Sequence, residues 1–165
     1  MEVLKQYLPL CWLKNNPLEL PRSLGFFKQN LLFYFVIAYF MQTNMTTDPL
    51  ESFVEVSIET LLALTFIGVM LFFNRTLYAY IQVATAILLC ANIVALPLIP
   101  VLIWLTVSED ILSYYFLGLL LLWEFVLVTN IIRRVLSINV FASLILSLVY
   151  FIVSYLGAFG LGQLL

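Results

Sequence analysis

Long apolar segments alternate along the chain with short clusters of charged and turn-forming residues. Each apolar segment is long enough to cross a hydrocarbon layer about 30 Å thick as an α-helix, which needs about 20 residues. The pattern therefore predicts an all-α fold, a polytopic membrane helix bundle with about five transmembrane helices. The expected spans are approximately Phe26–Met45, Phe53–Phe73, Leu77–Leu96, Ile111–Ile132 and Ile138–Gly160.

This segmentation divides the chain into two regions. Residues 24–165 form the predicted transmembrane helical domain, and residues 1–23 precede it as an interfacial or flexible N-terminal segment. Within that segment, apolar residues from Val3 to Trp12 recur at helical spacing, which is typical of a helix lying at a membrane surface. Pro9 interrupts the stripe, so the helix is expected to be short or bent. A poorly ordered tail is the alternative interpretation.

The stretch Pro97–Val107 is the least regular part of the pattern, because it contains Pro97 and Pro100. Each proline removes a helical N–H and disfavours helix in the residue before it. A third span continued to Val107 would also be far longer than the roughly 20 residues that a bilayer requires. We therefore expect a short helix in the membrane interface, anchored by Trp104, rather than a kinked continuation of the third span.

Charge is distributed unevenly between the two sides that five crossings define. The connections on one side hold Asp48 and Glu51, then Glu109 and Asp110. Because cytoplasmic loops are enriched in Lys and Arg, the opposite side is predicted to be cytoplasmic, with the N-terminus inside and the C-terminus outside. The basic residues on that side are Lys5, Lys14, Arg22, Lys28, Arg75, Arg133 and Arg134.

Composition excludes much of ordinary enzymology. Apolar residues make up 64% of the chain and charged residues 10%, whereas soluble domains average about 25% charged residues. The absence of histidine from the sequence excludes His-based triads and imidazole ligation of metals or haem. Cys11 and Cys90 lie in different segments, so neither a disulfide nor a metal site is expected. We expect no catalytic residue, cofactor or metal, and no nucleic-acid partner, since no basic patch suits one.

Glu124 is the leading candidate for a functional residue. It lies inside the apolar run Leu117–Val128, about 12 Å from the inner end of its span. Because the spans contain no Lys or Arg partner at that depth, the neutral acid is favoured over the ion. Gln82, Thr85 and Ser147 lie at similar depth and are candidate hydrogen-bonding partners for the carboxyl group. The acid is therefore either a structural polar contact or a functional site.

A second set of acids lies on the second span. Glu51, Glu55 and Glu59 recur every four residues, so they share one helical face that runs from the outer connection into the membrane. That face is either an entry site for a cation or proton, or an end of the helix wetted at the interface. Glu59 is expected about 9 Å and Glu124 about 20 Å below the outer end of the bundle. This difference in depth argues against a pair of carboxyls that share a proton.

The fifth span carries a stripe of small residues, which allows two helix backbones to approach closely. The partner is another span of this chain, an identical subunit or a different membrane protein. We therefore expect the lipid bilayer as the surroundings, and other membrane protein subunits or self-association as partners. The residues of this packing seam are Ser143, Ser147, Ser154, Ala158 and Gly162.

The layout as a whole resembles a known family. Five closely spaced spans include a proline-containing turn after the third, and Trp123-Glu124 in the fourth. Ile132-Arg133-Arg134-Val135 then leads into a fifth span rich in small residues. Residues 24–160 thereby resemble, in layout, the bacterial branch of the Yip (Ypt-interacting protein) family of polytopic membrane proteins. The resemblance implies a non-enzymatic helical protein, which we expect in the bacterial cytoplasmic (inner) membrane.

Three classes of function fit these observations. The leading one is a non-enzymatic scaffold or accessory subunit that acts through helix–helix contacts, as the seam and the lack of a catalytic motif suggest. The alternative is a small oligomeric transporter, proton pathway or channel that uses Glu124 and the face of Glu55 and Glu59. An intramembrane enzyme acting on a lipid or quinone is the third, and the lack of histidine counts against it.

Overall fold

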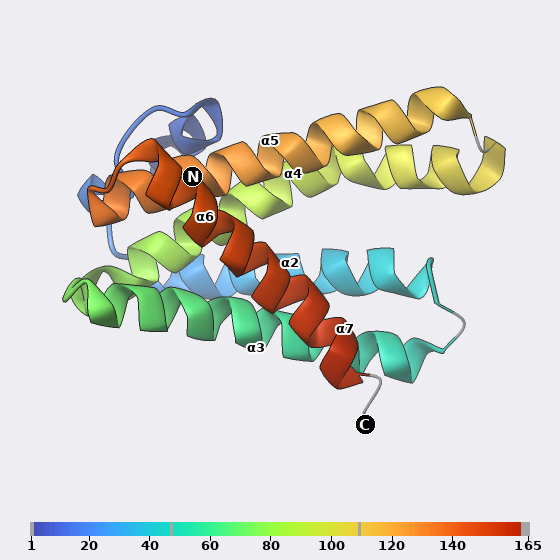
Figure 1. The fold of residues 1–165 in the computed structure, drawn as a ribbon, viewed down its shortest axis with the longest axis horizontal. Helices are drawn as coiled ribbons and strands as arrows, with labels where there is room; N and C mark the ends of the chain where they lie inside the picture. Colours follow the sequence, from blue (N-terminus) through green and yellow to red (C-terminus); the bar gives the residue numbers. More distant parts are fainter. Residues whose placement is uncertain (1, 47, 109, 163–165) are drawn as a thin grey trace.

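The computed structural model describes residues 2–46, 48–108 and 110–162, and these residues form helices joined by short turns (Figure 1). Glu109, and residues 163–165 of the expected transmembrane domain, lie outside the described residues. The α-helices are α1 (Glu2–Tyr7), α2 (Leu24–Thr43), α3 (Pro49–Phe73), α4 (Tyr80–Ser108), α5 (Ile111–Leu136), α6 (Val140–Phe151) and α7 (Gly157–Gly162). Short 3₁₀ turns cover Leu8–Trp12 (η1), Pro17–Glu19 (η2) and Leu77–Ala79 (η3), and a π-helical turn covers Ile152–Leu156 (η4).

Among the described residues, five helical segments are long and apolar enough to cross a membrane, which confirms the expected all-α bundle at this level. The last of them is built from α6, η4 and α7 in succession. The second begins earlier than expected, because Pro49 occupies its first turn and Asp48 caps it by accepting the N–H of Leu50. The segments are Leu24–Thr43, Pro49–Phe73, Leu77–Ser108, Ile111–Leu136 and Val140–Gly162.

The expectation of a separate interfacial helix over Pro97–Val107 is wrong. α4 continues through Pro97 and Pro100 to Ser108, and both prolines lie on its exposed side. Trp104 packs against Phe116 of α5, with ring centroids 6.2 Å apart, so this part of α4 pairs with a neighbouring helix. Neighbouring helices are what make proline tolerable within a transmembrane helix.

The bundle consists of two helical hairpins, α2–α3 and α4–α5, with the last span crossing both (Figure 1). α6 packs against α5, and η4 and α7 pack against α3. The connections α2–α3 and α4–α5 lie at one end of the bundle, which we call the acidic end because it carries Asp48, Glu51 and Asp110. The opposite end is called the basic end, because it carries the N-terminal segment, Arg75 between α3 and α4, and Arg133 and Arg134 in the last turn of α5.

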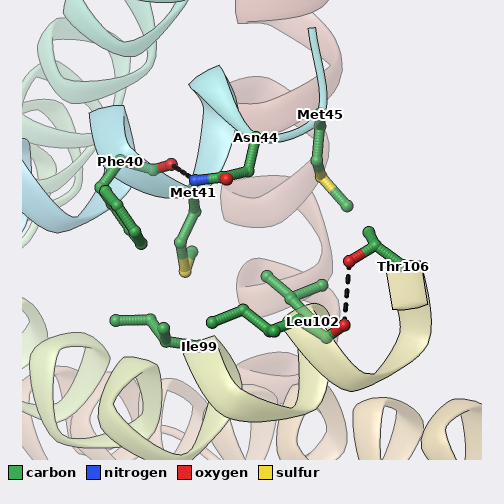
Figure 2. A pocket seen from close by; sticks show the side chains of 8 residues that line it. Phe40, Met41, Asn44, Met45, Ile99, Leu102 and Thr106 are labelled. Atoms are coloured by element: carbon green, nitrogen blue, oxygen red, sulfur yellow. Dashed lines mark hydrogen bonds between the residues drawn. The ribbon is translucent and has the colours of Figure 1, made fainter. Parts of the chain in front are cut away.

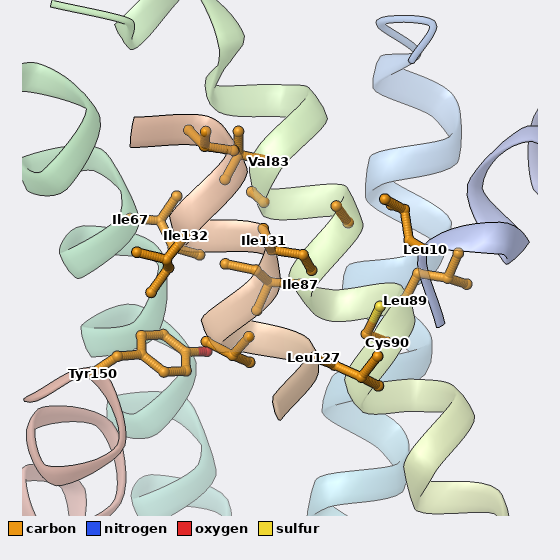
Figure 3. Close-up of a cluster of buried hydrophobic side chains, with 14 of the residues drawn as sticks. Leu10, Ile67, Val83, Ile87, Leu89, Cys90, Leu127, Ile131, Ile132 and Tyr150 are labelled. Carbon is orange, nitrogen blue, oxygen red and sulfur yellow. The ribbon is translucent and has the colours of Figure 1, made fainter. Parts of the chain in front are cut away.

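The apolar core fills the half of the bundle nearer the basic end. Its largest buried side chains come from the C-terminal half of α3, the N-terminal half of α4 and the C-terminal half of α5. They include Ile67, Leu71, Val83, Ile87, Leu127, Ile131 and Ile132, with Tyr150 of α6 beside them (Figure 3).

The N-terminal segment packs on this core through Tyr7, Leu10 and Cys11, all of which are buried. Trp12 is 69% exposed, because the chain passes from α1 into η1 and the expected single apolar stripe is broken there. The basic half of the bundle is therefore dense and covered by the N-terminal segment.

Candidate functional site

A cavity of about 310 Å³ lies between the two hairpins in the half of the bundle nearer the acidic end. We call it the acidic-end cavity. Its wall comes from the second half of α2, the first half of α3, the middle and second half of α4, the first half and middle of α5, and η4. Apolar side chains make up most of the wall, with Leu98, Leu102, Leu117 and Leu121 among them. The polar residues that line it are Tyr34, Gln42, Glu59, Asn92, Glu124 and Tyr155.

A smaller pocket of about 50 Å³ extends the cavity toward the acidic end (Figure 2). The two share Met41, Met45 and Leu102. The polar side chains at the mouth, Asn44 and Thr106, bond to carbonyls of their own helices, namely those of Phe40 and Ile103. Flexible methionines and locally satisfied polar groups therefore line the approach to the cavity.

Glu124 is 8% exposed, and it lines the cavity. Within the described part of the chain, its carboxyl group has no hydrogen bond to another protein group. None of its three expected partners lines the cavity. Their polar atoms donate elsewhere: Gln82 to the carbonyl of Leu20 at 2.8 Å, Thr85 to that of Ile81 at 2.5 Å, and Ser147 to that of Ser143 at 2.8 Å.

The two hydroxyl groups follow the usual habit of Ser and Thr in helices, which is to bond the carbonyl one turn earlier. Gln82 instead fastens the N-terminal connector to α4. Similar expected depth within the spans therefore did not predict which side chains contact Glu124.

Glu59 lines the same cavity as Glu124, and accepts a hydrogen bond of 2.5 Å from the hydroxyl of Tyr34. The early start of α3 places Glu59 about 15 Å along its helix, while Glu124 lies about 20 Å along α5. The expectation that a large difference in depth separates the two carboxyls is therefore wrong. They face one shared space from opposite hairpins.

Glu55 lies outside this space, so the expected common face of Glu55 and Glu59 is divided between two environments. Glu55 is 6% exposed and accepts a hydrogen bond from the Gln42 side chain. Gly162 of α7 packs directly on it: a Cβ at that position would lie 2.8 Å from Cγ of Glu55. Glu55 therefore joins α2, α3 and the end of the last span.

Asn92 is a site residue that sequence reasoning missed. Its Nδ2 donates to the main-chain carbonyl of Asn30 at 3.0 Å, which directs Oδ1 the other way. That oxygen is buried and has no partner among the described residues. The available signal in the sequence was an amide side chain within the third apolar segment.

The cavity combines unused acceptors with a shortage of donors. The Glu124 carboxyl and the second carboxyl oxygen of Glu59 are acceptors without a protein donor among the described residues, since Tyr34 donates to the other Glu59 oxygen. Asn92, which also lines the cavity, has a buried Oδ1 that is likewise without a donor. The described residues that line it include no Lys or Arg. A ligand that brings a positive charge and its own donors would complement these groups.

The small-residue seam is buried inside the chain. Ser143 and Ser147 lie on α6, which packs on α5, while Ser154 and Ala158 belong to the segment that packs on α3. Gly162 continues this contact against Glu55.

The π-helical turn η4 lies in the middle of this last span and supplies Tyr155 to the cavity wall. Such turns interrupt the helical register, and they are frequent at functional sites. The hydroxyl group of Ser154 in the same turn is buried without a partner among the described residues.

No family model, no curated protein and no solved structure matches this chain. The resemblance to the Yip family consequently stays a prediction from layout, and the candidate function rests on the geometry of the cavity.

Proposed function

We propose that the protein is an integral membrane carrier that binds a small lipophilic ammonium ion in the acidic-end cavity and exchanges it for a proton. The observation that carries the proposal is the gathering of two carboxyls, Glu59 and Glu124, with Asn92 around one largely apolar space. The other parts of the proposal are a bacterial cytoplasmic membrane, and the acidic end on its outer side, as the charge distribution indicates.

Coupling to protons follows from the electrostatics of the two carboxyls. Neighbouring ionised acids repel each other, and an ionised acid in an apolar space without a counter-ion is costly. Either a proton or an organic cation relieves this cost at Glu124. The two therefore compete for one group, and competition for a shared group is what an exchange mechanism requires.

The hydrogen-bond acceptors and the apolar wall of the cavity indicate which class of cation would bind there. A primary or secondary ammonium brings two or three N–H donors for Glu124, Glu59 and Asn92, whereas a quaternary ammonium brings none. The leucines of the wall suit an alkyl body, and Tyr34 and Tyr155 add aromatic groups that favour a cation. A volume of about 310 Å³ limits the ligand to a small molecule.

The difference between the acidic and basic halves of the bundle suggests how the cavity would open to each side of the membrane in turn. The acidic half is hollow, while the basic half is closed by the dense apolar core and the N-terminal segment. A carrier with this arrangement is open to one side, and the opposite half must loosen to release the ligand. The scaffold role favoured by sequence stays a prediction, but its main support, the seam, is used within the chain.

Binding of hexylammonium to purified protein in detergent tests the proposal. Wild-type protein is expected to bind it and to release protons into weakly buffered solution, as a pH-sensitive dye would show. Glu124→Gln keeps the shape of the side chain but cannot ionise, so affinity should fall by about tenfold or more and proton release should fall with it. Glu51→Gln is the matched control, because Glu51 lies on the same helix as Glu59, exposed and outside the cavity.

Transport is measured in proteoliposomes that contain a pH-sensitive dye. Exchange of one ammonium ion for one proton moves no net charge, so the readout is the internal pH. Addition of hexylammonium outside should raise that pH faster than in protein-free liposomes, where only the neutral amine crosses. Glu124→Gln should fold normally by size-exclusion chromatography and give the protein-free rate. Equal binding, proton release and rate in wild type and this variant would refute the carrier and favour the scaffold.

A further inference from the structure

Cys11 and Cys90, the only two cysteines of the sequence, lie against each other despite their wide separation along the chain. Their Sγ atoms are 3.5 Å apart, and both side chains are buried. Cys11 belongs to η1, and Cys90 lies inside α4. We propose that the pair is an oxidation site, at which a peroxide joins the thiols into a disulfide that ties the N-terminal segment to α4.

The N-terminal segment is held in place on both sides of Cys11. Before it, the hydroxyl of Tyr7 donates to the carbonyl of Pro21 at 2.9 Å. After it, Arg134 of α5 donates to the carbonyls of Leu13 and Asn15, each at 2.8 Å. These contacts fix the approach of η1 to α4, so the two sulfur atoms are neighbours in the folded chain.

The Arg134 contacts depend on an unusual backbone. Leu13 and Asn15 have φ angles of 60° and 61°, in the left-handed region that is uncommon for residues other than glycine. The bonds from Arg134 compensate for this conformation by using carbonyls of the same two residues. Oxidation would add a covalent link to an arrangement that polar contacts already hold.

The geometry requires little movement for bond formation. A disulfide has its sulfur atoms about 2.05 Å apart, so the present separation must close by about 1.5 Å. Rotation of the two side chains and a small shift of η1 can supply this, because η1 is a single short 3₁₀ turn.

The reaction balances with peroxide as the oxidant. The Cys11 thiolate attacks one peroxide oxygen and becomes a sulfenic acid, and the other oxygen leaves as water after protonation. The Cys90 sulfur then attacks the Cys11 sulfur, the S–S bond forms, and the sulfenic oxygen leaves as a second water. Two thiols and one hydrogen peroxide thus give one disulfide and two waters, with two electrons passing from sulfur to oxygen.

Cys11 is the better first nucleophile. The hydrogen bond with the Cys90 thiol lowers the pKa of Cys11, and burial opposes this effect. Cys11 also lies in the covering segment rather than within a span, so a small polar oxidant reaches it with less intrusion into the core.

The test uses the full chain in detergent, treated with hydrogen peroxide and then denatured in the presence of polyethylene-glycol maleimide. Reduced protein should gain two labels, and oxidised protein should gain none while remaining a monomer on a non-reducing gel. Mass spectrometry of a digest should identify a peptide pair joined through Cys11 and Cys90. Dithiothreitol should restore both labels.

Two variants keep the proposal falsifiable. Cys11→Ser should leave the Cys90 thiol available for labelling after the same treatment. In the Cys11→Ser background, Trp12→Cys moves the thiol to an adjacent but 69% exposed position, from which it should not pair with Cys90. Two free thiols in peroxide-treated wild type, or equal cross-linking from position 12, would overturn the proposal.

Discussion

Asn92 has one bonded and one unbonded polar atom in the same side chain. Its nitrogen joins α4 to the backbone of α2. Its oxygen is buried without a partner among the described residues, in a side chain that lines the acidic-end cavity. A buried amide oxygen without a partner is costly, and such atoms in folded proteins call for an explanation. Under the proposed function, a small shift of this side chain would let a bound ammonium N–H become its partner.

Asn92→Leu therefore tests the proposed ligand class directly. Loss of the acceptor should weaken binding of hexylammonium by about tenfold. The affinity for hexyltrimethylammonium, which has no N–H, should change little, so the preference between the two ions should shrink. Titration calorimetry with both ions measures this preference.

Asn30→Leu serves as the control for the Asn92 substitution, because the main-chain carbonyl that holds Asn92 remains. This variant should keep the wild-type preference. Parallel losses for both ions in Asn92→Leu would indicate a general disturbance of the cavity instead.

At the scale of elements, the last span is fitted to α3 by the absence of side chains at particular positions. Gly162 faces Glu55 so closely that an added methyl group would overlap it, whereas a Cβ at Gly160 would meet nothing within 4 Å. The two glycines lie on the same short helix, α7. The contact therefore leaves no room for a side chain at position 162, whereas position 160 has room for one.

Gly162→Ala should lower the free energy of unfolding by about 1–3 kcal/mol through overpacking, since Glu55 is buried and bonded to Gln42. Gly160→Ala should be neutral or slightly stabilising, because alanine favours helix more than glycine does. Thermal unfolding of both variants in the same detergent compares them. Equal midpoints would show that α7 does not hold this position against α3.

Sequence patterns predicted the elements better than their contacts. Five apolar segments were enough to anticipate the bundle, yet the two prolines of α4 wrongly indicated a helix end. Proline weakens a helix locally, but packing against α5, as at Trp104 and Phe116, determines whether the helix continues. The helix propensity of proline carries no information about the packing of α5 against α4.

Contacts between distant segments were the least predictable feature. Counting residues from an assumed helix start separated Glu59 from Glu124 by about 11 Å in depth, and the start of α3 at Pro49 reduces that difference to about 5 Å. The proximity of Cys11 to Cys90 had no signal in their spacing at all. Both depend on how hairpins and the N-terminal segment pack, which only the folded chain specifies.

For the molecule as a whole, the alternation of the helices places the α3–α4 connection with Arg75, the end of α5 with Arg133 and Arg134, and the N-terminal segment together at the basic end. Arg134 links two of these parts, since it joins the end of α5 to the N-terminal connector. An excess of Lys and Arg on one side is the feature that predicts the orientation of helical membrane proteins.

The orientation is tested with reporters that are active on only one side of a bacterial membrane. A reporter fused after Arg134 should be cytoplasmic, and one fused after Leu165 should lie on the opposite side. Substitution of Arg133 and Arg134 by Gln should weaken this preference. Both reporters on the same side would exclude five crossings.

Under the proposed function, the depth of Glu124, about 20 Å along a helix close to 40 Å long, determines how membrane voltage would act on the site. A cation that enters from the acidic end and a proton that leaves by the same route would cross the same part of the transmembrane field in opposite directions. Although a full crossing at 100 mV is worth about 2.3 kcal/mol for one charge, the two contributions would cancel. The concentration difference of the ligand and the pH difference, rather than the voltage, would therefore drive the exchange.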